Sequence, residues 1–320
     1  MTAAAKKLID RRSDYDVTNA VRTTDVSAVV QEVRNIYVDL FSKSGAGNLA
    51  QPFRDFEALY NGDFPGYHAC DTGYHDVQHV LDVTLAMARL LDGYKQAGRE
   101  TLDERQFRLG VILALYHDCG YIRRRADHRH RNGAEYTLTH VSRSARFLRS
   151  YLPSLGMSDL ADVASRLVHF TGYETPVESI RIDQPIQRVI GNLLGSADII
   201  AQMADRCYLE KCYDRLFPEF MLGGVARRKT SEGEKVIFES AADLIAKTPG
   251  FYQGAAKRLD QALEGAYHYA EQHFGGRNLY VEAVEKNMRY ARVLSETNTI
   301  SSLRRRPPRD AAGGKQITRI

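Results

Sequence analysis

The segment 107–116 restricts the fold of this 320-residue chain more than any other stretch. Its residues, FRLGVILALY, are apolar on nearly every face of a helix, and such a helix belongs in the middle of a core. His117 and Asp118 follow directly. Burying a charge without a partner costs several kcal/mol, so a polar doublet at this place indicates a partner of opposite charge. A metal ion would supply that charge.

Two histidines four residues apart, His75 and His79, lie upstream of this doublet. Residues at this spacing project from one face of a helix, so the two imidazoles can point into one small volume. The preceding residues 71–73, Asp-Thr-Gly, supply capping oxygens and a turn residue. They predict that His75 lies in the opening turn of a helix. Together these imidazoles and the carboxylate are what a hydrolytic metal site needs.

Helical periodicity dominates the chain, and no segment has a convincing alternating strand pattern. The predicted fold class is therefore all-α, a multi-helix bundle around a buried metal site. The expected helices span 26–42, 75–94, 104–118, 133–151, 159–170, 184–217, 235–247, 251–274 and 279–296.

The domain organisation follows from length and composition. With 43% hydrophobic and 26% charged residues, the chain can bury a large core. We expect a flexible N-terminal segment at 1–25, a single helical domain at 26–297 and a disordered basic tail at 298–320. Because the tail has no apolar periodicity, its removal is expected to leave stability nearly unchanged.

The location of the protein is predicted from what the sequence lacks. No stretch approaches the eighteen or more apolar residues of a membrane helix, and the first residues contain no apolar signal core. We expect a cytoplasmic protein that does not contact a membrane. The cysteines form no C-x-x-C pair and are expected to be reduced; they are Cys70, Cys119, Cys207 and Cys212.

Three motifs carry a resemblance to a known superfamily. Residues 74–83 resemble the class I cyclic nucleotide phosphodiesterase signature Tyr-His-Asn-x-x-His-Ala-x-Asp-Val, and His117-Asp118 resembles the doublet that names the HD phosphohydrolase superfamily. Residues 195–200, Gly-Ser-Ala-Asp-Ile-Ile, resemble the stretch that holds its final metal-binding Asp. The motifs keep the superfamily's order, and the resemblance spans roughly residues 55–220. It implies an all-helical, metal-dependent phosphohydrolase.

The resemblance also implies roles for particular residues. His79, His117, Asp118 and Asp198 would hold the principal divalent ion, which could be Zn, Mn, Mg or Fe, and Asp118 would bridge to a second ion. His75 would act as the general acid that protonates the leaving oxygen while a metal-bound hydroxide attacks phosphorus.

The sequence departs from the phosphodiesterase pattern at two places. That family has a histidine where this chain has Tyr121, and its Glu-Phe-Phe-x-Gln-Gly-Asp segment is only faintly echoed at 219–224. Cyclic nucleotide specificity is therefore not implied. Other HD branches place further histidines between the doublet and the last Asp, so His140 and His169 are candidates for a second metal position. Packing in the core remains the alternative for both.

Four more residues are candidates for supporting roles. Asp82 could orient an imidazole, or be an ordinary helix carboxylate. Gln202 could line the pocket or bridge helices, Tyr121 lies near the second ion by resemblance, and Arg123 begins the basic run 123–131, which could lean over a phosphate substrate.

The leading hypothesis is a phosphohydrolase that acts on a small-molecule, nucleotide-like phosphate mono- or diester. The alternative is a non-catalytic sensor that keeps an HD metal pocket to bind a nucleotide. Nucleic-acid binding through 123–131 and the tail is the weakest hypothesis, because no aromatic residue is interleaved in the basic run. The sequence does not give the oligomeric state.

Overall fold

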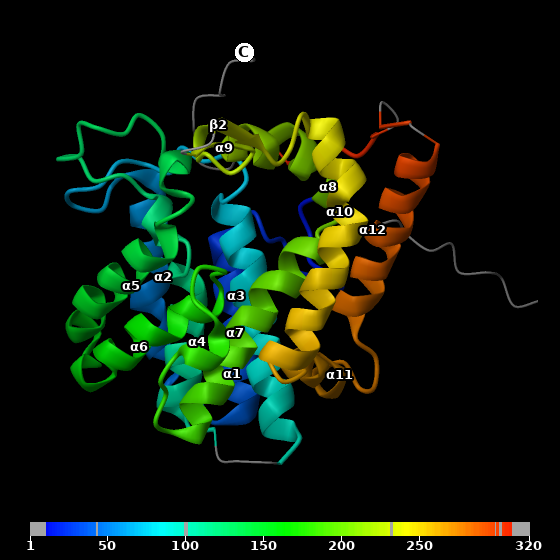
Figure 1. The fold of residues 1–320 in the computed structure, drawn as a ribbon. Helices are drawn as coiled ribbons and strands as arrows, with labels where there is room; N and C mark the ends of the chain where they lie inside the picture. Colours follow the sequence, from blue (N-terminus) through cyan, green and yellow to red (C-terminus); the bar gives the residue numbers. More distant parts are fainter. Residues whose placement is uncertain are drawn as a thin grey trace, which may run out of the picture.

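The computed structural model describes residues 11–42, 44–98, 102–230, 233–297, 299–300 and 303–308, and its architecture is an all-α bundle (Figure 1). This confirms the predicted fold class. The helices are α1 (Val26–Leu40), α2 (Ala50–Asn61), α3 (Val77–Gln96), α4 (Glu104–Tyr116), α5 (His140–Tyr151), α6 (Ala161–Leu167), α7 (Pro185–Ala204), α8 (Tyr208–Lys211), α9 (Phe217–Leu222), α10 (Ala241–Lys257), α11 (Tyr269–His273) and α12 (Leu279–Glu296). None of the described helices is long and apolar enough to cross a membrane.

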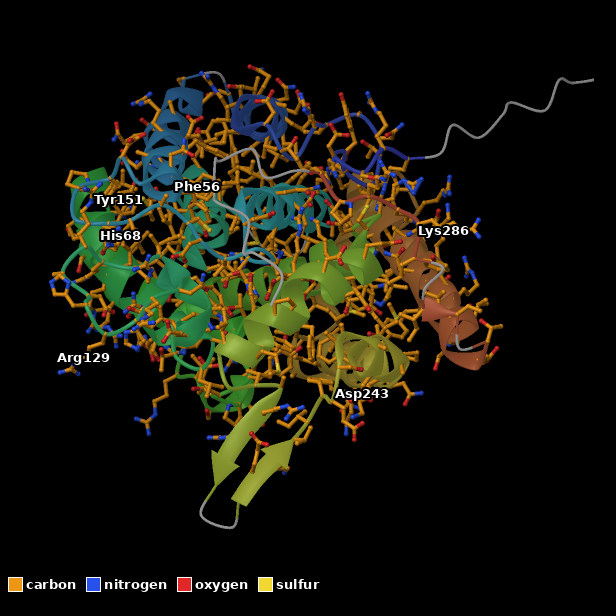
Figure 2. The ribbon with its side chains drawn as sticks, turned by 90° about the horizontal axis from the view of Figure 1, so that it is seen from above. Phe56, His68, Arg129, Tyr151, Asp243 and Lys286 are labelled. Carbon is orange, nitrogen blue, oxygen red and sulfur yellow. The ribbon has the colours of Figure 1, made fainter. Side chains whose placement is uncertain are left out.

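The described strands are β1 (Arg227–Thr230) and β2 (Gly233–Val236), which form an antiparallel hairpin with Arg227 opposite Val236. Figure 2 shows the hairpin projecting from the helical body. The sequence had predicted a helix from residue 235, so the start of that helix was wrong. The residues of β2 are all exposed, and α10 begins at Ala241 after its N-cap Ser240.

Helices α3, α4 and α7 form the centre of the bundle. α3 packs against α1, α4, α7 and α11, and α7 packs in turn against α12. Figure 1 shows α5 and α6 on one side of this centre and α10 and α12 on the other. Every residue of α4 from Leu109 to Tyr116 is buried, and His117 and Asp118 follow directly. The doublet thus follows a fully buried stretch, as predicted, although α4 is not the most buried helix: α3 is buried throughout from Val83 to Tyr94.

The start of α3 differs from the prediction. Asp76 is the N-cap, and its carboxylate accepts the backbone N–H of His79. His75 therefore lies just outside the helix and not in its opening turn. The expected capping residue Asp71 does not cap this helix, because its carboxylate accepts the backbone N–H of Gly133.

Two other predicted helices are interrupted. The helix expected over 184–217 ends at Ala204, because Asp205 has an extended backbone with ψ of 133° and its carboxylate accepts the N–H of Cys207. The helix expected over 251–274 is broken at Gly265, whose φ of 67° is left-handed. Helix α2 was not predicted, and the helix expected from 133 begins only at His140. By contrast, α12 has the predicted bounds, 279–296.

The N-terminal segment is anchored by a buried ion pair. Asp16 and Arg89 are 4% and 2% exposed, and their charged groups lie 2.6 Å apart. Arg89 also donates to the hydroxyl of Tyr280. Removing one partner of a buried pair typically costs about 3–5 kcal/mol. The prediction that residues 1–25 are flexible is therefore wrong for the part from residue 11 onward; residues 1–10 lie outside the described residues.

The basic tail is also anchored in part. The side chain of Arg305 donates to Asn287 Oδ1 at 3.0 Å and to the carbonyl of Arg206. Its backbone N–H donates to Glu210, which is 2% exposed. The prediction of a disordered tail is thus wrong for residues 303–308, because Arg305 donates to acceptors of the helical core. Residues 309–320 lie outside the described residues.

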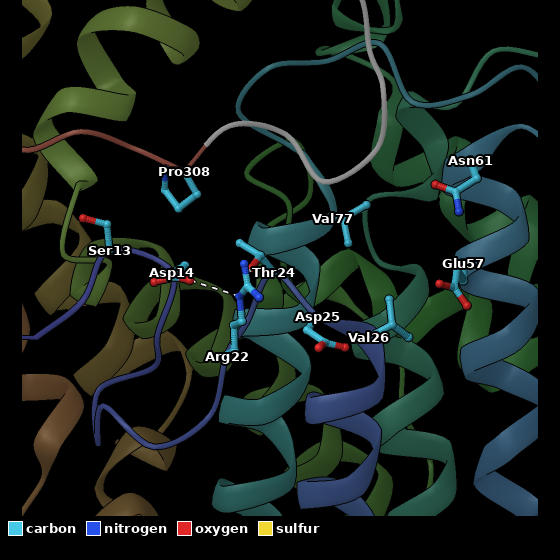
Figure 3. A pocket seen from close by; sticks show the side chains of 10 residues that line it. All are labelled: Ser13, Asp14, Arg22, Thr24, Asp25, Val26, Glu57, Asn61, Val77 and Pro308. Atoms are coloured by element: carbon cyan, nitrogen blue, oxygen red, sulfur yellow. Dashed lines mark hydrogen bonds and ion pairs between the residues drawn. The ribbon is translucent and has the colours of Figure 1, made fainter.

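The tail then reaches a pocket at the start of α3. Pro308 accepts a hydrogen bond from Arg215 and lines a cavity of about 650 Å³ (Figure 3). The first residue of α3, Val77, lines the same cavity together with Asp25, Glu57 and Asn61. The anchored part of the tail therefore lies next to the helix that carries His79.

We predict that a chain ending at Ile300 is less stable than a chain ending at Pro308. The shorter chain loses Arg305 and leaves the buried acceptors Glu210 and Asn287 without their donors, which should lower the free energy of unfolding by about 2 kcal/mol. Urea unfolding of both truncated proteins measures the difference. Equal stabilities would show that the contacts of Arg305 contribute nothing.

Candidate functional site

Three separate elements bring the four predicted metal ligands together. α3 supplies His79, the turn after α4 supplies His117 and Asp118, and α7 supplies Asp198. The Nε2 atoms of His79 and His117 each lie 3.2 Å from Asp118 Oδ2. They lie 3.6 and 3.8 Å from Asp198 Oδ1. A buried cluster of His79, His117 and Asp118 could hold a metal ion.

The donor atoms of this cluster fit such an ion. Nδ1 of His117 lies 2.7 Å from the carbonyl oxygen of Ala114. Because a carbonyl only accepts, Nδ1 must carry hydrogen, and Nε2 remains for another partner. Both His117 Nε2 and Asp118 Oδ2 are buried without a hydrogen-bond partner. Four ligands about 2.1 Å from a tetrahedral ion lie about 3.4 Å from one another, close to the separations found here.

The charges of the cluster depend on one another. Burial disfavours the charged imidazolium, but the carboxylates of Asp118 and Asp198 outweigh it and raise the pKa of His117 to about 9. Burial likewise opposes the charge of Asp118, but His117 and His79 lower its pKa well below the usual range. A proton on His117 thus compensates the carboxylates when no cation is bound. A metal ion would displace that proton.

His140 faces the other oxygen of the same carboxylate. Its Nδ1 donates to the carbonyl of Thr137 at 2.7 Å, and its Nε2 lies 3.5 Å from Asp118 Oδ1. Burial lowers the pKa of His140, with a further contribution from His75. The two oxygens of Asp118 thus face different histidines, Oδ2 facing His79 and His117 and Oδ1 facing His140.

Gly120 allows this approach of His140. A Cβ atom at residue 120 would lie 1.9 Å from the carbonyl oxygen of His140, a position no side chain could occupy. The backbone N–H of Gly120 donates to Ser144, and its carbonyl accepts from Arg143. Two residues of α5 thus fix the turn that carries Asp118.

His169 has no hydrogen bond or ion pair to Asp118 or His140 among the described residues. Its Nδ1 is buried without a hydrogen-bond partner, and burial lowers the pKa of its imidazole. The charge of Glu174 acts on both His169 and His140. Of the two histidines considered for a second metal, His140 is the one within ion-pair distance of Asp118.

His75 is held by a carboxylate that was not predicted. Its Nδ1 lies 2.6 Å from Oε2 of Glu219, whose Oε1 accepts the backbone N–H of Tyr74. Burial opposes a charge on His75, but Glu219, followed by Asp118 and Asp198, raises its pKa above the usual value. His75 is therefore built to carry a proton, and its Nε2 is not used by Glu219.

No local pattern in the sequence places residue 219 beside residue 75. The one indication is that Glu219-Phe220 faintly resembles the phosphodiesterase Glu-Phe-Phe segment. In the structure, a π-helical segment, Cys212–Leu216, leads into α9 and aims Glu219 inward. Arg215 in this segment donates to the carboxylate of Asp76 at 2.9 Å. The start of α3 and the carboxylate that holds His75 are thus tied together.

The other candidates have different surroundings. Both Nε and one terminal nitrogen of Arg123 lie 2.9 Å from Asp71, so its charge is already paired. Gln202 accepts from the hydroxyl of Tyr74 at 3.4 Å. Asp82 lines a small cavity with Asp205, and burial together with Asp205 raises its pKa. Among the described contacts, no hydrogen bond joins Asp82 to a histidine, so a role in orienting one is not supported.

The basic run contributes mainly to its own structure. Arg125 donates to the carbonyl oxygens of Tyr67 and Gly62, and His130 pairs with Asp127. Arg129 lies at the outer edge of the molecule (Figure 2). These contacts do not direct the run toward the metal cluster.

Comparisons with known proteins yield a structural neighbour. No protein-family model and no curated protein matches the chain. Among solved structures, the phosphodiesterase domain of the RhoPDE fusion protein from the choanoflagellate Salpingoeca rosetta aligns with 90% of this chain and 96% of that chain. The TM-score is 0.48 and the identity is 12%. We assign no residue role from this likeness.

We predict that His117→Ala and Asp118→Ala both lose bound metal, because each removes one of few donors from a site without spare ligands. His128→Ala, which changes an exposed histidine of the basic run, should keep the metal content of the parent. Elemental analysis of the purified, folded proteins measures this. Full metal occupancy in Asp118→Ala would contradict the site.

Proposed function

We propose that the protein is a metal-dependent phosphohydrolase of the HD superfamily that cleaves a nucleotide-like phosphate mono- or diester. One observation carries this proposal. The candidate metal cluster lies beside an imidazole that is hydrogen-bonded to a buried carboxylate, and the ring centroids of His75 and His79 are 5.6 Å apart. A metal and a proton donor in one site are the two requirements for expelling an alkoxide from phosphorus.

A divalent ion, when bound, lowers the pKa of a water molecule and neutralises charge on phosphoryl oxygens. His79, His117, Asp118 and Asp198 would hold it. The donor set of two nitrogens and two carboxylates suits zinc, manganese or iron. The second oxygen of Asp118, with His140, supports a place for another ion.

His75 supplies the remaining proton. Glu219 accepts from Nδ1, and its charge outweighs the effect of burial and raises the pKa of His75 above the usual value, which favours the imidazolium. Nε2–H can then donate to the leaving oxygen as the ester bond breaks. Glu219 keeps the same contact throughout and balances the positive charge that the ring carries before the transfer.

The alternatives receive less support. A sensor that only binds a nucleotide has no use for a proton donor, and the His75–Glu219 pair costs the burial of a carboxylate that is 0% exposed. Nucleic-acid binding would need free cations, whereas Arg123 and Arg125 already have partners within the chain.

We predict that His75→Ala keeps its metal and loses rate on a nucleotide substrate. General acid assistance is typically worth about a hundredfold to ten-thousandfold, and it matters most for a poor leaving group such as a ribose alkoxide. On a nitrophenyl phosphate ester the defect should be much smaller, because nitrophenolate hardly needs a proton. Turnover on both esters and metal content measure this.

The control for this comparison is His268→Ala, since His268 is exposed and pairs only with Glu271. It should match the parent on both esters. An equal loss of rate on both esters in His75→Ala, or loss of its metal, would mean that His75 is a ligand or a structural residue.

A further prediction concerns Glu219→Gln. The neutral amide cannot balance the imidazolium, so the pKa of His75 should fall. The protonated form is the active one: activity is present below this pKa and is lost as the pH rises through it. The pH–rate profile on a nucleotide ester should therefore decline at a lower pH than in the parent. An unchanged profile would show that Glu219 does not control this proton.

A further inference from the structure

Tyr121 stacks on the proton donor and on His140. Its ring centroid lies 4.3 Å from that of His75 at an interplanar angle of 17°, and 4.4 Å from that of His140 at 19°. Tyr121 is 2% exposed. Tyr74 and His79 contact His75 edge-on, at 69° and 89°. Tyr121 thus offers a parallel ring face to both imidazoles.

The stacking contact can fix the plane of the His75 ring, which a single hydrogen bond does not fix. The bond from Nδ1 to Glu219 holds one end of the imidazole, but the ring can still rotate about the line that joins these two atoms. Such a rotation would swing Nε2 away from the metal cluster. A parallel aromatic ring restricts this rotation, because a tilted imidazole would collide with the phenol or lose the stacking contact.

The hydroxyl of Tyr121 has a separate contact. It lies within hydrogen-bonding reach of Thr137, whose own hydroxyl lies 2.6 Å from the carbonyl oxygen of Ala134. The two stacking contacts with His75 and His140 are made by the ring.

We infer that Tyr121 is a positioning residue, which fixes the ring plane of His75 so that Nε2 points at the leaving oxygen. This inference rests on the proposed function. The phosphodiesterase pattern has a histidine at the position of Tyr121. This chain therefore has a stacking aromatic ring where that pattern has an imidazole. In this role Tyr121 acts through the ring that it orients.

Tyr121→Phe and Tyr121→Leu separate the ring from the hydroxyl. Tyr121→Phe keeps the stack and should retain the parent rate on a nucleotide ester, although it loses the bond to Thr137 and should melt at a lower temperature. Tyr121→Leu keeps an apolar side chain without a flat face. Its kcat on the nucleotide ester should fall about tenfold to a hundredfold, with a smaller loss on a nitrophenyl ester and unchanged metal content.

A spectroscopic readout tests the stack without any substrate. Protons that lie over an aromatic face shift upfield, so the carbon-bound protons of His75 should be upfield-shifted in NMR spectra of the metal-free parent. Tyr121→Phe should keep this shift and Tyr121→Leu should lose it. Tyr151→Leu is the matched control, because Tyr151 is buried and stacks on Phe147 outside the site. It should lose stability and leave both the shift and the ratio of rates unchanged.

The outcomes distinguish the two proposals. If the parent with added metal hydrolyses neither ester, the proposed function fails, and the assignment of Tyr121 as a positioning residue fails with it. If the parent is active, the inference alone is overturned by any of three results: full activity of Tyr121→Leu, an equal loss in Tyr121→Phe and Tyr121→Leu, or a fall in metal content in Tyr121→Leu.

Discussion

The carboxylate of Asp118 is the constraint on which the site depends. It directly follows the buried stretch of α4, and its Oδ2 faces two imidazoles while its Oδ1 faces a third. Burial of a charge is costly, and a proton on His117 offsets that cost when no cation is bound. His117 Nε2 and Asp118 Oδ2 have no hydrogen-bond partner among the described residues, so both atoms could bind a metal ion.

The surrounding structure is arranged to hold these partners in place. The N-cap of α3 aligns His79, the turn at Gly120 brings α5 close to Asp118, and α7 places Asp198 on the open side of the cluster. On the other side, Arg215 links the cap Asp76 to the segment that leads to Glu219. The positions of the metal cluster and of the proton donor therefore both depend on the first turn of α3, and a shift of α3 would disturb both.

The sequence predicted the parts of the site that local spacing and burial determine. His117 and Asp118 could be found because a polar doublet ends an apolar helix, and Asp198 because a motif surrounds it. Glu219 could not be found, since a contact across 144 residues has no local pattern. Asp82 shows the limit of periodicity: three residues after His79 it lies on the same broad face, yet its neighbour is Asp205 and not an imidazole. The anchored termini were missed for the same reason, because Asp16 and Arg305 find their partners far along the chain.

The separation of the two carboxylate groups explains how one site can hold two positive charges. A metal ion and the imidazolium of His75 repel each other, and burial strengthens that repulsion. Asp118 and Asp198 lie with the metal donors, whereas Glu219 binds the nitrogen of His75 that does not serve the substrate. Each cation thus has its own counter-charge. In the proposed reaction, an anionic phosphate bound between them would gain attraction from both, and the proton that it receives would leave Glu219 paired with a neutral ring. The stacked face of Tyr121 would still hold that ring, because aromatic stacking does not require a charge on it.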